Sequence, residues 1–271
     1  MHLAVYTLLI AVALVVLWFA LARRRTPYTR RQFTLYIVNN FFARVMWRTQ
    51  TSGPLPVKEN EGAVIVSNHR AGVDPLLIQL SANRVVHWLV AREYYEMPVI
   101  SFIFRNLKSI PVNRGGIDTA ATKMAIRLVQ EGEIVGLFPE GRVNMTDDLL
   151  LPGRPGAALI ALKGRAVVIP CYVTGAPYNG TALGSFFMFG HARVVVGQRI
   201  DLSEYFGREG DKAVLEELTK RFLVEIAKLA GEENYPAKVA GRKWKPGDEE
   251  AGEGDVTPHD IGEVTNATDG E

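Results

Sequence analysis

The sequence predicts an α/β fold in which helices flank a mixed central sheet, preceded by an N-terminal transmembrane helix and an interfacial amphipathic helix. Three observations predict it. Apolar runs alternate with amphipathic segments between about residue 55 and residue 240, which is typical of layered α/β domains. The chain starts with twenty uncharged residues, 3–22. A helical pattern rich in aromatic residues follows directly behind them.

The uncharged stretch Leu3–Ala22 has the length of a membrane span, because a helix of twenty residues extends about 30 Å. A cleavable signal peptide is the alternative, since "ALA" at 20–22 resembles a cleavage site. However, no positive charge precedes the stretch, and it is longer than the apolar centre of a signal peptide. Five arginines follow within residues 23–31. We therefore expect residues 1–25 to be an uncleaved anchor whose C-terminal side is cytoplasmic.

Residues 26–54 are expected to form an amphipathic interfacial helix and a linker. In "RQFTLYIVNNFFARVMWRTQ", apolar residues recur every four positions at Phe33, Ile37, Phe41 and Val45. Such a helix faces either a protein core or a membrane interface, and its position behind an anchor favours the membrane. "TSGPLP" then ends the helix, so the globular domain, 55–240, is expected to begin near residue 55.

The elements of that domain follow from periodicity and end signals. The helix over 118–131 has Asp118 as its cap and Gly132 at its end. The predicted strands are 63–67, 85–91, 108–112, 134–139, 166–175 and 192–198, and the other predicted helices are 75–82, 97–106, 155–163 and 211–230.

Charge is distributed unevenly along the chain. Residues 246–271 carry nine acidic and no basic residues, so the rest of the chain carries +11 although the whole carries +2. We expect residues 241–271 to form an acidic disordered tail. A basic body indicates an anionic partner, either a membrane surface, a phosphate-bearing ligand or a nucleic acid. The single cysteine, Cys171, lies in an apolar run and is expected to be buried.

The candidate catalytic pair is His69 and Asp74 in "SNHRAGVDPLL". Residues five apart do not share a face of one helix, so His69 must lie in a loop that folds back on the helix start. Asp74 precedes Pro75 and is expected to cap that helix. On these two residues alone, a capped helix start without chemistry is the favoured interpretation, and catalysis is the alternative.

Other polar residues follow the remaining strands, and ligands of α/β sheets bind beyond the strands' carboxyl ends. Arginine suits a phosphate through its planar fork of donors. We therefore expect one anion site made by three arginines at strand ends, Arg92, Arg114 and the Arg142 of "FPEGR", which also presents the carboxylate of Glu140 and the flexible Gly141.

The motifs together resemble the glycerolipid acyltransferase family, which includes the 1-acyl-glycerol-3-phosphate (lysophosphatidate) acyltransferases. "NHRAGVD" is similar to that family's NHx₄D block, "IPVNR" to its second block, "FPEGR" to its third and "VIPCYV" to its fourth, in the family's order. The threonine of the third block is missing here, so Arg142 follows Gly141 directly, and position 92 is arginine where many relatives have lysine.

The resemblance implies transfer of a fatty acyl group from a thioester donor, acyl-CoA or acyl carrier protein, to the free hydroxyl of 1-acyl-glycerol-3-phosphate, which gives phosphatidic acid. His69 would act as general base and Asp74 would orient it, while Arg92, Arg114, Glu140, Gly141 and Arg142 would bind the acceptor. No bound cofactor and no metal ion are expected. The expected partners are the lipid bilayer, a lysophospholipid acceptor and the acyl donor, at the cytoplasmic face of the cell membrane.

Three alternatives stay open. The first is an acceptor that is another lysophospholipid, the second is a lyso-aminolipid acceptor, and the third is a membrane-anchored lipid-binding protein without activity. A metal-dependent hydrolase is disfavoured because the histidines form no metal-ligand motif, and no GxSxG supports a serine hydrolase. A nucleic-acid partner is not expected, because the basic surplus lies largely beside the apolar anchor.

Overall fold

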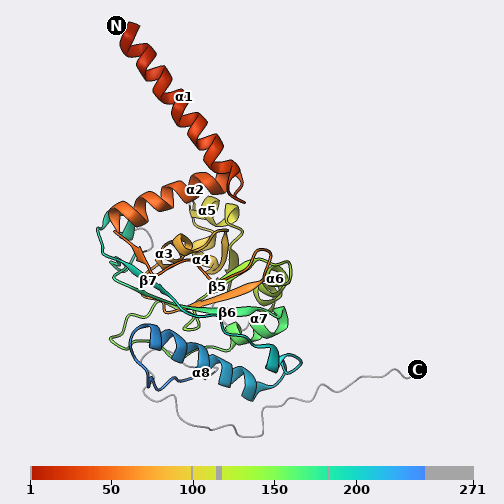
Figure 1. Cartoon of the computed structure of the whole chain (residues 1–271). Coiled ribbons are helices and arrows are strands. Elements are labelled where there is room, and N and C mark those ends of the chain that lie inside the picture. The colour runs from red at the N-terminus through yellow and green to blue at the C-terminus, as the bar shows by residue number, and fades with distance from the viewer. Residues whose placement is uncertain (1, 99, 114–117, 182–183, 242–271) are drawn as a thin grey trace, which may run out of the picture.

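The computed structural model describes residues 2–98, 100–113, 118–181 and 184–241. Residues 242–271 of the predicted acidic tail and the predicted site residue Arg114 lie outside the described residues. Within them, seven strands form one sheet in the order β1-β7-β6-β2-β5-β3-β4 (Figure 1). The strands are β1 Gln50–Thr51, β2 Ala63–Ser67, β3 Val86–Ala91, β4 Ile110–Val112, β5 Ile134–Leu137, β6 Val167–Thr174 and β7 Arg193–Val196.

The sheet is mixed, as the sequence predicts. β6, β2, β5, β3 and β4 run parallel to one another, whereas β7 is antiparallel to β6. β1 is parallel to β7 at the outer side. The carboxyl ends of the five parallel strands therefore lie at one edge of the sheet, which we call the carboxyl edge.

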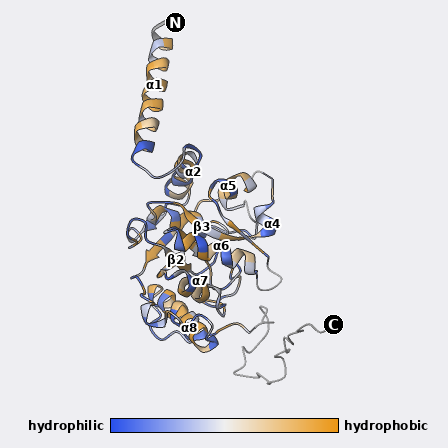
Figure 2. Ribbon diagram, turned by 90° about the vertical axis from the view of Figure 1, so that its right-hand side faces the viewer, coloured by the Kyte–Doolittle hydropathy of each residue, from blue (hydrophilic) through white to orange (hydrophobic). Residues whose placement is uncertain are grey.

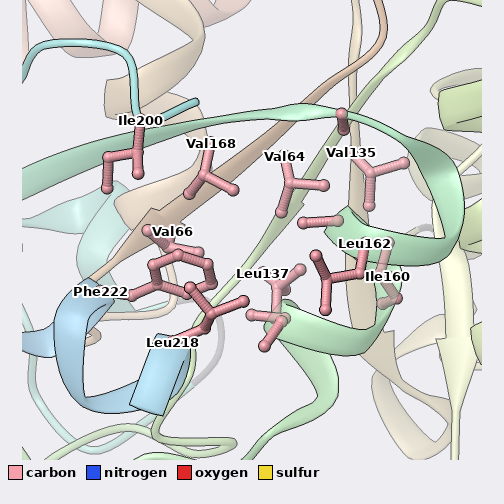
Figure 3. Close-up of a cluster of buried hydrophobic side chains, with 14 of the residues drawn as sticks. Val64, Val66, Val135, Leu137, Ile160, Leu162, Val168, Ile200, Leu218 and Phe222 are labelled. Atoms are coloured by element: carbon pink, nitrogen blue, oxygen red, sulfur yellow. The ribbon is translucent and has the colours of Figure 1, made fainter. Parts of the chain in front are cut away.

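One face of the sheet is covered by three helices, α6 Thr119–Gln130, α7 Gly156–Gly164 and α8 Lys212–Leu229. Figure 3 shows side chains of the strands, such as Val64 and Val135, meeting Leu162 of α7 and Phe222 of α8. Alternate residues of β2 point to opposite faces, so Val64 and Val66 join this core while Ala63 and Ile65 join the other. Because both faces are covered, the strand sequence is apolar throughout rather than alternating.

Shorter helices lie on the opposite face, between the sheet and the N-terminal region (Figure 1). They are α3 Asp74–Ile78, the 3₁₀ turn Gln79–Ser81, α4 Arg92–Tyr95 and α5 Ile100–Asn106. The core on this face contains Leu77 and Ile78 of α3 together with Trp47 and Cys171, all fully buried. Every strand and helix predicted between residues 63 and 230 is present, whereas β1 and α4 were not predicted.

The N-terminal helix α1, His2–Arg24, extends away from the rest of the chain (Figure 1). Among the described residues it is the one helix that is long and apolar enough to cross a membrane. Its surface is hydrophobic along most of its length and hydrophilic at its C-terminal end, where Arg23 and Arg24 lie (Figure 2). The apolar stretch 3–22, which predicts an anchor, therefore forms one continuous helix that is exposed over most of its length.

Helix α2, Arg30–Phe41, starts with a capping box in which Thr29 and Gln32 satisfy each other's backbone N–H groups. A single turn of π-helix, Phe42–Met46, follows it, so the predicted uninterrupted helix changes its pitch at residue 42. Part of this segment belongs to the core, because Phe33 and Trp47 are buried, whereas Phe41 and Val45 are exposed. The sheet already includes Gln50 and Thr51, ahead of the predicted domain start at residue 55.

Candidate active site

The polar stretches that follow the parallel strands meet at the carboxyl edge, as the sequence predicts. His69 follows β2, Phe138 follows β5 and Arg92 follows β3, and these three strands are neighbours in the order β2-β5-β3. The topology therefore brings together segments that are separated by up to seventy residues in sequence.

His69 and Asp74 are in direct contact, with His69 Nδ1 3.0 Å from Asp74 Oδ2. The Asp74 side chain is fully buried and His69 is mostly buried. Since a carboxylate accepts hydrogen bonds, the contact assigns the proton to Nδ1 and leaves Nε2 with a lone pair. The pair thus has the geometry of an oriented imidazole base.

The expectation that Asp74 caps the helix is wrong. Val73 precedes the helix, and Asp74 is its first residue, followed by Pro75. The carboxylate points back into the turn, where Oδ2 accepts the backbone N–H of Arg70 at 2.7 Å and of Ala71 at 2.8 Å. Asp74 therefore fixes the loop that carries His69 as well as the imidazole itself.

Two buried polar side chains anchor this loop to neighbouring strands. The Asn68 amide bonds both the N–H and the C=O of Val173 on β6, at 2.7 and 2.8 Å. Glu140 accepts the backbone N–H of His69 at 2.7 Å through Oε1 and that of Leu151 at 2.8 Å through Oε2. Burial raises the pKa of Glu140 to about 7, although both N–H groups favour the charged form.

Glu140 is fully buried, so this geometry does not support the predicted contact with substrate. Both of its oxygens are occupied by backbone N–H groups. We assign it a positioning role, because it ties the backbone of His69 to the loop that follows β5.

Arg70 fixes that loop from the other side. Its guanidinium donates to the carbonyl oxygens of Asn144, Thr146 and Asp148 at 3.3, 2.5 and 2.9 Å. The backbone N–H of Asn144 in turn donates to the carbonyl of His69 at 2.7 Å. The chain between Gly141 and Asp148 is thereby joined to the His69 turn by four hydrogen bonds that involve backbone carbonyls.

The imidazole of His69 is the first of three rings in a continuous stack with Phe138 and Trp88. The Phe138 ring lies 3.8 Å from the His69 ring, centroid to centroid, with 5° between their planes. Trp88 on β3 lies 4.9 Å from Phe138 on its other side, at 18°. Gly136 leaves room for the indole, since a Cβ there would come within 2.7 Å of it. The stack restricts rotation of His69 about its side-chain bonds.

The described residues of the predicted anion site lie in two places, Arg92 beside the end of β4 and the others in the FPEGR turn. The half-exposed Arg92 donates through Nε to Asn113 Oδ1 at 2.7 Å, next to the end of β4. Gly141 has a φ of +72°, and a Cβ there would lie 3.2 Å from the Arg154 side chain. Burial, and then the charge of nearby Arg142, lower the pKa of Arg154. Arg142 and Arg154 thus form a pair of neighbouring cations beside the FPEGR turn.

Known proteins are similar to this chain over the region that contains His69, Asp74 and Glu140. A family model described as "Acyltransferase" matches residues 48–174. A 1-acyl-sn-glycerol-3-phosphate acyltransferase of Bacillus subtilis is 28% identical over 173 residues, which is 60% of this chain and 83% of that protein. Residues 48–174 of this chain are therefore an acyltransferase domain, and its named relatives are glycerolipid acyltransferases. This chain is an O-acyltransferase enzyme.

Two further relatives define how far the acyltransferase likeness extends. The crystal structure of the 1-acyl-sn-glycerophosphate acyltransferase PlsC from Thermotoga maritima shares the fold, with a TM-score of 0.57 and 19% identity over 77% of this chain and 83% of that chain. An uncharacterized protein of Mycobacterium tuberculosis is 30% identical over 150 residues, and the matched segment covers 50% of this chain but only 39% of that protein.

Several residues of the acyltransferase site escaped sequence reasoning, namely Phe138, Trp88, Arg70, Asn68 and Arg154. Arg70 directly follows His69, and Phe138 lies two positions before Glu140. This closeness to candidate site residues in the sequence could have indicated that both belong to the site. Arg114 lies outside the described residues. In the part of the chain that the structure describes, no group of three or more His, Cys, Asp or Glu side chains is arranged to hold a metal ion.

Proposed function

We propose that the enzyme transfers a fatty acyl group from a thioester donor to the free hydroxyl of 1-acyl-glycerol-3-phosphate, forming phosphatidic acid for phospholipid biosynthesis. The observation that carries this proposal is the 3.0 Å contact between His69 Nδ1 and the fully buried Asp74 carboxylate. The names of the Bacillus relative and of an acyltransferase of Borreliella burgdorferi, 30% identical over 118 residues, support the choice of acceptor.

In the proposed reaction His69 Nε2 takes the proton of the acceptor hydroxyl while its oxygen attacks the thioester carbonyl carbon. Asp74 stabilises the imidazolium that forms, and holds the ring in the required tautomer. The tetrahedral intermediate then breaks its carbon–sulfur bond, and the imidazolium returns its proton to the departing thiolate. One ester and one free thiol result, without an acyl-enzyme.

The acceptor's phosphate is assigned to the arginines beside the FPEGR turn. Arg142 and Arg154 place two guanidinium groups beside the FPEGR turn, and a guanidinium can donate to a phosphate through its planar fork. Arg92, at the end of β3, supplies a third cation at the same edge of the sheet. Arg114 remains a proposed member of this group.

The membrane supplies the acceptor and retains the product, since both are amphiphiles. We assign α1 as a single-pass anchor in the cell membrane, with the catalytic domain on the cytoplasmic face because five arginines lie within residues 23–31. An active site held there has access both to bilayer lipids and to acyl-CoA or acyl carrier protein made in the cytosol.

The test uses the full chain, purified in detergent and offered acyl-CoA or acyl carrier protein against a panel of lysolipids, with released thiol as the readout. We expect turnover on 1-acyl-glycerol-3-phosphate and a loss of about 10²–10⁴-fold in His69→Ala. The matched control is His191→Ala, since His191 is exposed and contacts Arg48 rather than a carboxylate. Turnover only on lysophosphatidylethanolamine would change the acceptor, and no turnover on any lysolipid would refute the proposal.

A further inference from the structure

The connection between β6 and β7 presents two unusually exposed aromatic side chains. Phe187 is 85% exposed and Phe189 is 73% exposed, more than any large apolar side chain described in α1. Exposing a phenylalanine ring to water is unfavourable compared with burying it, because apolar surface is driven out of water. The rings of Phe187 and Phe189 therefore indicate a surface that is covered in the working protein.

The segment that carries these rings is firmly attached, so their exposure is built into the fold. Between them and β6, the Ser185 carbonyl accepts the indole N–H of Trp47 at 3.0 Å. On the other side, the Gly190 N–H donates to the Met46 carbonyl at 3.1 Å. The neighbouring ring of Phe186 packs inward, with its centroid 5.1 Å from that of Phe42.

Helix α2 and the π-turn continue this surface. Val38, Phe41 and Val45 are spaced three and four residues apart, so they lie on one side of the helix, and all three are exposed. We call these three residues together with Phe187 and Phe189 the apolar rim. The two parts of the rim are joined through the Phe42–Phe186 contact.

The charge of the N-terminal region indicates what covers the rim. Residues 23–57 include seven arginines and no acidic residue. A basic, aromatic and apolar surface beside a transmembrane helix matches the interface of a bilayer that contains anionic phospholipid.

The sheet topology relates the rim to the active site. Thr174, the last residue of β6, pairs with Arg193, which in turn pairs with Gln50 of β1. The β6–β7 connection and the end of the π-turn thus both lie at the carboxyl edge, where His69 follows β2.

We propose that the apolar rim is a second contact with the bilayer, in which Phe187 and Phe189 enter the interface of an anionic membrane and turn the carboxyl edge towards it. α1 alone fixes only where the chain is tethered, whereas two contacts also fix the orientation of the catalytic domain. The inference rests on the proposed function insofar as a membrane-resident acceptor requires that orientation.

Single-cysteine labelling tests the proposal with the full chain. Cys171 is fully buried and burial raises its thiol pKa to about 12, so the natural thiol does not compete for a maleimide fluorophore. Phe187→Cys and Phe189→Cys are labelled with an environment-sensitive fluorophore, and the wild type measures background. The matched control is Met124→Cys, an exposed apolar position on α6, which covers the opposite face of the sheet.

Each labelled protein is reconstituted into vesicles of phosphatidylglycerol and phosphatidylcholine, with and without spin labels on the acyl chains. We expect a several-fold rise in emission at positions 187 and 189 and strong quenching by the spin-labelled lipid, but neither effect at position 124. Emission and quenching at 187 and 189 equal to those at 124 would overturn the proposal.

The same measurement in a His69→Ala background separates this proposal from the proposed function. Quenching should be unchanged there, because membrane contact does not depend on turnover. Quenching at 187 and 189 in a protein that acylates no lysolipid would refute the proposed function alone. Turnover without quenching would refute the rim contact alone.

Discussion

At the scale of single residues, Trp88 reaches the site through one intervening ring. It stacks on Phe138, which stacks on His69, so it touches no reacting atom and acts as a positioning residue. Trp88→Leu should lower kcat by about tenfold with little change in KM, because loss of the stack lets the imidazole leave its productive orientation.

The control for Trp88→Leu is Phe222→Leu, which alters a fully buried ring on the opposite face of the sheet. Steady-state kinetics normalised to the folded fraction should show a normal kcat in Phe222→Leu despite lower stability. Equal kcat losses in the two variants would mean that Trp88 contributes only to folding. Trp88→Phe should recover most of the activity, since it keeps a ring in the stack.

The raised pKa of Glu140 predicts how the free energy of unfolding depends on pH. Its pKa is raised to about 7 in the folded protein, so between about pH 4.5 and pH 7 the folded state retains a proton that the unfolded chain has released. The contribution to the unfolding free energy is therefore present below pH 4.5 and is lost as pH rises to 7, by at most about 1.4 kcal/mol per pH unit.

Glu140→Gln removes this titration but leaves one backbone N–H without an acceptor, which costs about 1–3 kcal/mol. Denaturant unfolding in detergent, measured at several pH values, should therefore show the variant less stable at pH 4.5, with a gap to the wild type that shrinks and closes or reverses as pH rises to 7. A gap that stays constant over this range would contradict the raised pKa.

At the scale of elements, the loop that follows β5 depends on one side chain of the loop that follows β2. Arg70 binds three carbonyl oxygens between Asn144 and Asp148. Arg70→Ala should release the loop and lower kcat/KM by about 10- to 100-fold, because Arg142 sits at its start. Hydrogen exchange should report faster exchange in residues 142–148, and Arg127→Ala, an exposed arginine on α6, should change neither quantity.

The elements that sequence predicted well are those determined by local pattern. β2 and β5 are buried on both faces, so "AVIVS" and "IVGL" are continuous apolar runs, and Asp118 caps α6 by a hydrogen bond to the Ala121 N–H, as predicted. Asp74 contacts His69 as predicted, but the predicted capping of the helix is wrong: its carboxylate accepts backbone N–H groups of the turn before the helix instead.

The remaining site residues depend on which strands are neighbours. Glu140 and Phe138 contact His69 only because β5 pairs with β2, and Trp88 joins them only because β3 pairs with β5. A one-dimensional pattern contains His69 and Asp74 within a single turn, but contacts across 50 to 70 residues require the sheet order. The β1 strand was not predicted because a strand of two residues is too short to show any periodicity.

At the scale of the whole molecule, α1 and the apolar rim would make different contributions to membrane binding. α1 would span the hydrocarbon core, while the rim and its arginines would act at the surface, where salt screens their attraction to anionic lipid. Losing α1 should therefore convert an integral protein into one whose binding depends on ionic strength.

Leu9→Arg combined with Leu14→Arg tests this division, because each charge at the centre of a span costs about 2.5–3.5 kcal/mol. Carbonate extraction of membranes should leave the wild type in the pellet and release the double variant. Leu9→Ala with Leu14→Ala, the matched control, should stay in the pellet. At low salt the released protein should still bind vesicles of phosphatidylglycerol, and it should dissociate as salt is raised. Binding that persists in high salt, or none at low salt, would contradict a surface contact carried by the rim and its arginines.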